Sequence, residues 1–129
     1  SYSALSGIRV WVNRWTKFLK ERNLDNHIYI GVGKGGFRKF RSTVYGFSKM
    51  VDTRIARSLR IARSLNPDQS AIVVTKEIFD EVLETDLASS LNEFDPFTLG
   101  ENEDEKELSR KQSINSGLIE GEKVYEFKV

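Results

Sequence analysis

The most constraining feature of the sequence is a short, uninterrupted apolar run, Ala71-Ile-Val-Val74. A run of this length and type is typical of a strand that lies buried inside a sheet. Apolar runs elsewhere are no longer, far short of the roughly 20 residues that a bilayer-spanning helix needs. With 129 residues, the whole chain, 1–129, is expected to form one domain with its own core.

A helical pattern opens the chain. Over residues 4–22, apolar side chains recur at spacings of three and four residues, which places them on one face of a helix. The stripe consists of Leu5, Ile8, Val12, Trp15 and Leu19, widened by Trp11 and Phe18. We therefore expect the two tryptophans to be anchors of the hydrophobic core.

Two strand-like runs follow, at residues 27–33 and 37–46. The short glycine-rich connection between them favours a hairpin. Gly31-Val-Gly-Lys-Gly-Gly36 also matches the spacing G-x-G-x-x-G, but a dinucleotide site or a phosphate-binding loop requires a helix directly behind the glycines. The following residues predict a strand instead. Lys34 and Arg38 remain candidate phosphate contacts beside this loop.

A second helix is predicted from Ser48 to the turn at Pro67. It contains a six-residue tandem repeat, in which Arg54-Ile-Ala-Arg-Ser-Leu59 recurs immediately as residues 60–65. Six residues are too few for a solenoid unit. We interpret the repeat as a small duplication that lengthens one helix.

The remainder of the chain contains a predicted helix over 76–87 and a closing strand over 123–129. Between them, residues 88–113 are polar, acidic and weakly periodic, which favours a long flexible loop or insertion. A solvated helix over 101–112 is the alternative. The resulting order, α-β-β-α-β-α-loop-β, predicts an α+β sandwich of the ferredoxin-like type, with the helices on one face of the sheet.

Composition excludes several kinds of chemistry. The chain has no cysteine and one histidine, His27, so it has no disulfides, no cysteine-bound zinc and no thiol nucleophile. The N-terminus does not have the pattern of a signal peptide. These features predict a soluble, cytoplasmic domain without a membrane span.

The net charge of +1 conceals a strong segregation of charge. Residues 34–63 contain nine basic side chains and one acid, whereas residues 77–107 contain twelve acids and one lysine. One interpretation is a pair of solvated faces that attract each other within the fold or between copies. The other is an anion site in the basic third, for a nucleotide, a phosphate or nucleic acid. Nucleic acid is the weaker alternative, because no known nucleic-acid-binding motif is present.

The middle of the chain resembles the class III nucleotide cyclases. Thr43-Val-Tyr-Gly46, then Val51-Asp-Thr-Arg-Ile-Ala-Arg57, then Ala71-Ile-Val-Val74 before an acidic helix are similar to the C-terminal half of that catalytic domain. Removal of one copy of the repeat restores the family's usual spacing. The strand at residues 27–33 and the ending Gly121-Glu-Lys-Val-Tyr-Glu-Phe127 are similar to family strands in the same order. The resemblance implies that the strands around Val44 and Ile72 belong to one sheet.

The resemblance also implies site residues. Thr43 matches the position that reads the purine, Asp52 falls where the family has a ribose-steadying asparagine, and Arg57 lies one position after that of the transition-state arginine, where this chain has Ala56. The carboxylate of Asp52 would repel a triphosphate. The motifs that supply the two metal-binding aspartates are not found in these residues. No metal ligand or cofactor is therefore expected from this chain, and Mg²⁺ or Mn²⁺ would require carboxylates from a partner.

Three functions follow as hypotheses. The first is a degenerate or partial cyclase domain that binds nucleotide, regulates or dimerises, with a homodimer or a partner cyclase-type domain as its assembly. The second is an active adenylate cyclase, converting ATP to cyclic AMP, whose metal-binding half comes from elsewhere. The third is a binding module whose arginine-rich helix recognises an acidic protein or nucleic acid.

Overall fold

The computed structural model describes residues 2–33, 35–40, 43–48, 51–63 and 70–128, and for 35–40, 43–48, 51–53, 62 and 63 it describes the backbone alone. In chain order its elements are α1 (Tyr2–Glu21), β1 (Tyr29–Val32), β2 (Gly35–Phe40), β3 (Thr43–Ser48), α2 (Val51–Arg63), β4 (Ala71–Thr75), α3 (Lys76–Val82), the 3₁₀ helix η1 (Asp86–Ser90), β5 (Leu91–Phe94), α4 (Glu103–Asn115) and β6 (Val124–Phe127). The predicted α+β class is confirmed.

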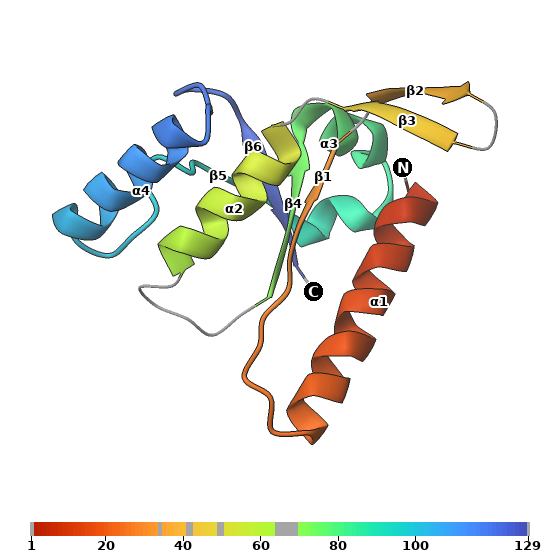
Figure 1. Cartoon of the computed structure of the whole chain (residues 1–129), viewed down its shortest axis with the longest axis horizontal. Coiled ribbons are helices and arrows are strands. Elements are labelled where there is room, and N and C mark those ends of the chain that lie inside the picture. Colours follow the sequence, from red (N-terminus) through yellow and green to blue (C-terminus); the bar gives the residue numbers. More distant parts are fainter. Residues whose placement is uncertain (1, 34, 41–42, 49–50, 64–69, 129) are drawn as a thin grey trace.

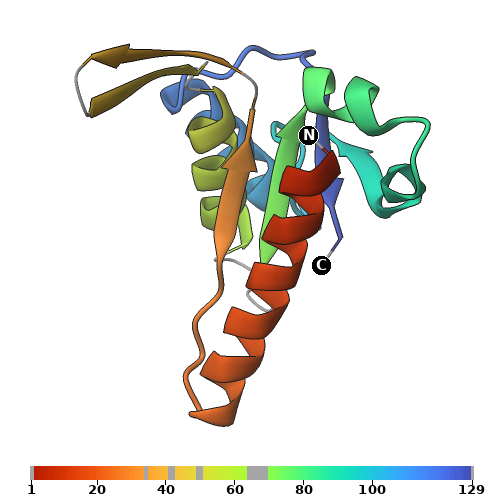
Figure 2. The same ribbon diagram turned by 90° about the vertical axis from the view of Figure 1, so that its right-hand side faces the viewer.

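A four-stranded sheet with the order β1-β4-β6-β5 forms the centre of the molecule. The strands β1 and β4 are parallel, and β6 is antiparallel to both of its neighbours. A parallel pair needs a crossover connection, and this connection contains α2. Figures 1 and 2 show α1 on one face of the sheet and α2 on the other.

Helices therefore cover both faces, and the prediction of helices on one face is wrong. The apolar run at β4 explains why. Ile72 and Val74 are buried in a cluster with Leu5 and Val12 of α1, whereas Ala71 and Val73 are buried in a second cluster with residues of α2. Since successive strand residues point to opposite faces, a strand with four successive apolar residues needs cover on both faces.

The glycine-linked hairpin between the first two predicted strands is also not formed. Instead, β1 pairs with β4, while β2 pairs with β3 in a separate two-stranded sheet. This second hairpin projects from the top of the molecule (Figure 1). The chain thus leaves the main sheet at Val32 and enters the projecting hairpin at Gly35.

The acidic segment has more regular structure than a loop. Residues 88–113 include the end of η1, the strand β5 and most of α4, and the alternative of a helix over 101–112 corresponds to α4. Asn102 caps this helix, because its side-chain oxygen accepts a hydrogen bond from the Glu105 backbone N–H at 2.9 Å. Acidic side chains in the first turn also interact favourably with the positive end of the helix dipole.

The end of α4 is closed by Gly117. Its φ of +80° is in the left-handed region, and the N–H groups of Gly117 and Leu118 donate to the carbonyls of Ile114 and Ser113. None of the helices in the described part of the chain is long and apolar enough to cross a membrane.

Candidate functional site

The candidate purine and phosphate contacts lie on the projecting hairpin. Arg38 is on β2 opposite Tyr45, and Thr43 begins β3 opposite Phe40, at the end of the hairpin that is far from α2. Lys34 lies outside the described residues. Because a strand rises roughly 3.3 Å per residue, Thr43 lies about 16 Å from Ser48, the last residue of β3.

The candidate catalytic residues lie on α2 instead. Asp52 is in its first turn, where only the backbone is described, and Arg57 is exposed in the middle of the helix. Ala56, which takes the place of the transition-state arginine, is buried against the sheet. The structure therefore does not bring Thr43 and Arg57 together within the chain.

The arginines of the repeat have different surroundings. Arg57 and Arg60 are exposed, whereas Arg54 is half-buried against the end of α4. A side chain added at Gly117 would come within 3.0 Å of an Arg54 guanidinium nitrogen. A guanidinium there complements the negative end of the α4 dipole. Arg54 thus has a structural position between two helices.

The expectation that the strands around Val44 and Ile72 share a sheet is wrong. Val44 is in the two-stranded sheet and Ile72 is in the four-stranded sheet. The helix between them does pack on the main sheet, where Ile55 and Leu59 are buried against Ala71 and Val73. Among the described residues, no group of three or more histidine, cysteine, aspartate or glutamate side chains is placed to hold a metal ion.

Sequence reasoning missed a surface that includes both tryptophans. Trp11 and Trp15 are 53% and 43% exposed, and the buried residues of α1 are Leu5, Val12 and Leu19. The prediction that both tryptophans anchor the core is therefore wrong. Their rings stack at a centroid separation of 6.2 Å, and Trp15 stacks on Phe18 at 5.0 Å. We call Trp11, Trp15 and Phe18 the aromatic stripe.

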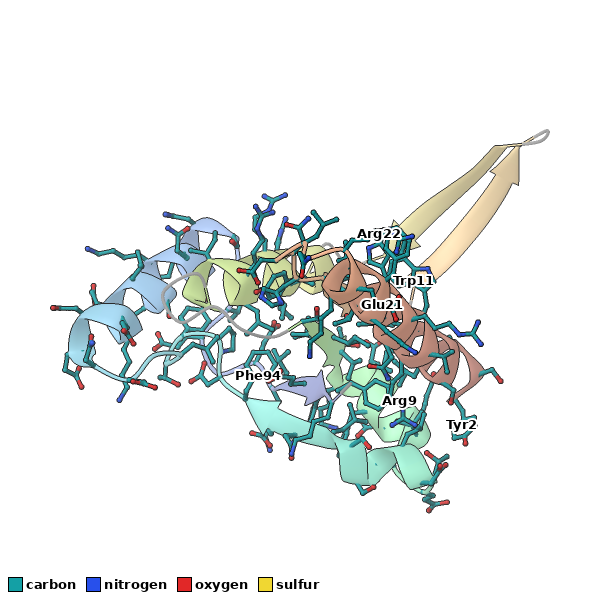
Figure 3. All side chains as sticks on the ribbon, turned by 90° about the horizontal axis from the view of Figure 1, so that it is seen from below. Tyr2, Arg9, Trp11, Glu21, Arg22 and Phe94 are labelled. Atoms are coloured by element: carbon teal, nitrogen blue, oxygen red, sulfur yellow. The ribbon has the colours of Figure 1, made fainter. Side chains whose placement is uncertain are left out.

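The aromatic stripe lies on the side of α1 that faces away from β5. Figure 3 shows Trp11 and Arg22 on one side of the helix, toward the hairpin, and Tyr2 and Arg9 on the other. The Arg22 guanidinium lies 3.5 Å from the centre of the Phe18 ring, so a cation–π contact closes the stripe. A signal for this arrangement was available, since positions 11, 15, 18 and 22 follow one helical face.

The opposite side of α1 is attached to the body of the domain. An Arg9 guanidinium nitrogen lies 3.4 Å from Ser90 Oγ, and the Arg9 side chain covers the Phe127 ring. A hydrogen bond to the Asp86 carboxylate raises the pKa of the Tyr2 phenol. Both Asp86 and Ser90 belong to η1. One side of α1 therefore contacts η1 and β6, whereas the side with the aromatic stripe is exposed.

The edge strand β1 completes the surface beside the aromatic stripe. Its residues are neither fully buried nor charged, and β4 is its one strand neighbour in the described sheet. Ile28, Ile30 and Val32 pack partly against the α1 cluster. An open backbone edge thus runs next to uncovered aromatic rings.

No protein-family model matches the chain, and comparisons with curated proteins and with solved structures give no significant match.

Proposed function

We propose that the chain is a partial, degenerate cyclase-homology domain of the class III type, which binds a purine nucleotide and acts as a regulatory or dimerising module in cyclic-nucleotide signalling. The proposal does not include a ferredoxin-like arrangement with all helices on one face, because α1 and α2 cover opposite faces of the sheet. One observation carries it: two parallel neighbouring strands, β1 and β4, are connected through a hairpin and α2, which packs on the sheet. The order of elements over this stretch agrees with the resemblance, whereas the pairing of β3 with β2 in a separate sheet does not.

The side chains of α2 support a regulatory role over catalysis. Transition-state stabilisation of a triphosphate reaction requires positive or hydrogen-bond-donating groups that are already oriented toward the developing charge. The resemblance assigns these roles to the positions of Asp52 and Ala56. Ala56 is apolar and buried, and a carboxylate at Asp52 would oppose the phosphate charge. The separation of Thr43 from Arg57 within one chain also favours a nucleotide site completed by a second chain.

Calorimetric titration with ATP and with GTP, each with and without Mn²⁺, tests the nucleotide part. We expect saturable binding of at least one nucleotide. Loss of a neutral hydrogen bond worth roughly 1 kcal/mol predicts that Thr43→Ala weakens binding about fivefold. Thr98→Ala is the matched control, since Thr98 is an exposed threonine after β5. Binding of neither nucleotide, or equal binding by Thr43→Ala, would contradict the purine site.

An assay for cyclic nucleotide formation tests the degenerate character. The chain alone, with ATP and Mn²⁺, is expected to form no cyclic AMP above the level without protein. Turnover by the isolated chain that is lost in Arg57→Ala would show an active enzyme and refute this assignment.

A further inference from the structure

We propose that the free edge of β1 and the aromatic stripe of α1 form one docking surface for an extended segment of a partner polypeptide, in which apolar and acidic side chains alternate. The inference uses neither the nucleotide site nor the resemblance to cyclases. It depends on the backbone of β1, the side chains beside it, and the charges of α1 and α2.

The backbone of β1 presents groups that another strand can pair with. The Ile28 carbonyl accepts a hydrogen bond from the Ala71 N–H at 2.9 Å. Because hydrogen-bonding directions alternate along a strand, Ile30 also faces β4, while the N–H and C=O groups of Tyr29 and Gly31 face the open edge. Gly31 has no side chain to obstruct another backbone. Addition of a strand to such an edge is a common mode of peptide recognition.

Apolar side chains continue from this edge to α1. Ile28, Ile30 and Val32 point to the face of the sheet that α1 covers, and each is only partly buried. The aromatic stripe lies on the neighbouring side of the helix, with two rings about half exposed. An added strand would place every second side chain between these groups. Its alternate residues are therefore expected to be apolar.

Charge determines the remaining residues of the partner segment. The side chains between the apolar ones point to the other face of the sheet, which α2 covers and where Arg57 and Arg60 of that helix are exposed. On α1 itself, Arg14 and Lys17 are exposed and Glu21 is the one acid. A second copy docked edge to edge would bring one basic α1 toward another, which is unfavourable. Acidic side chains would instead complement this surface. The occupant that fits is an acidic and apolar strand, rather than another copy of this chain.

The geometry is less suitable for nucleic acid or a membrane. Trp15 stacks in parallel with Trp11 and with Phe18, at interplanar angles of 6°. These contacts take up part of the ring face that a stacked base would need. The β2–β3 hairpin projects on the same side as Trp11 (Figure 3). This projection would hold a flat lipid surface away from the stripe.

A designed peptide tests the proposal directly. The probe is a terminally blocked octapeptide of alternating valine and glutamate, and its control alternates valine and lysine. Both tryptophans of the chain, Trp11 and Trp15, belong to the stripe, so their fluorescence reports on this surface alone. We expect the glutamate peptide to shift their emission to shorter wavelength and to slow amide exchange at Tyr29 and Gly31.

Variants distinguish the docking surface from general adhesion. Truncation of a central aromatic contact commonly costs more than 1 kcal/mol, so Trp15→Ala is expected to weaken peptide binding about tenfold. Ile119→Ala is the control, because Ile119 is 65% exposed and follows α4. Arg60→Glu on α2 is expected to weaken binding several-fold, whereas Lys111→Glu on α4 leaves it unchanged. Circular dichroism confirms that each variant is folded.

Four results would overturn the proposal. They are equal binding of the lysine peptide, a fluorescence shift without protection of the Tyr29 and Gly31 amides, an equal shift with anionic phosphatidylserine vesicles or with oligodeoxythymidine, and micromolar dimerisation that protects the same two amides. Failure of the nucleotide titrations would leave this proposal intact, because those experiments probe Thr43 on the hairpin.

Discussion

The two outer edges of the main sheet differ in how they are protected. The edge strand β5 contains Asn92 and Glu93, both exposed, and Glu93 lies 3.8 Å from the Lys123 ammonium. Charges on a short edge strand are a common protection against unwanted pairing. By contrast, β1 reads Tyr29-Ile-Gly-Val32, without a charge. The difference indicates that β1 is built to be covered and β5 is built to remain in water.

The helix α1 shows the same contrast between its two sides. Toward β5, Arg9 reaches Ser90 and covers Phe127. Toward β1, the aromatic stripe has no comparable cover among the described residues. A helix that was only a lid for the core would have polar residues on that side. The large exposed rings therefore coincide with the unprotected edge.

The largest expected effect is a difference in the free energy of unfolding between a substitution on the buried face of α1 and one in the aromatic stripe. Leu5 is 1% exposed and lies in the main cluster, so Leu5→Ala is expected to lower the free energy of unfolding by about 2–5 kcal/mol. Trp15→Ala should lower it by less than ~1 kcal/mol, although it removes a larger side chain. Urea denaturation measures both. Equal losses would mean that the stripe belongs to the core.

Two buried serines, one on α4 and one on α2, test how much a hydrogen bond next to β5 contributes to stability. The Ser113 hydroxyl on α4 donates to the Pro96 carbonyl at 2.9 Å, just after β5, whereas Ser58 Oγ has no hydrogen-bond partner in the described structure. Ser113→Ala should therefore cost about 1 kcal/mol, and Ser58→Ala should be neutral or slightly stabilising. Thermal unfolding of the two variants compares them. A larger loss from Ser58→Ala would show that its hydroxyl is satisfied.

The smallest expected effect concerns the charge on β5. Glu93→Val gives this edge the apolar character of β1, and we expect weak, concentration-dependent association in light scattering because the edge loses its protection. Glu107→Val on α4 is the control and should not associate. If Glu93→Val stays monomeric at every concentration at which Glu107→Val does, the charge does not protect the edge.

Local patterns in the sequence predicted much of the secondary structure. The apolar run at 71–74 is β4, and the alternation at Tyr125 and Phe127 places both side chains in the main cluster. These predictions depend only on which face of an element is apolar. Strand pairing was less predictable, since the glycines after residues 27–33 are compatible both with a hairpin and with an exit from the sheet.

The candidate site was harder to predict for a related reason. Helical periodicity placed Trp11 and Trp15 near one stripe with Leu5, Val12 and Leu19, but it cannot decide where the buried arc of a helix ends. The position of the sheet determines which residues of the helix are buried, and both tryptophans lie outside that buried arc. The resemblance aligned Thr43 with Arg57 along the chain, whereas the separate pairing of β3 moves Thr43 to the hairpin end.

Amide hydrogen exchange in the free protein, followed residue by residue by NMR, tests the openness of β1 most directly. Ile30 faces β4, so its amide is expected to exchange slowly, while the neighbouring amides of Tyr29 and Gly31 exchange at least about a hundredfold faster. Equal, slow exchange at all three residues in a monomeric sample would contradict the account, because another part of the chain would then already cover this edge.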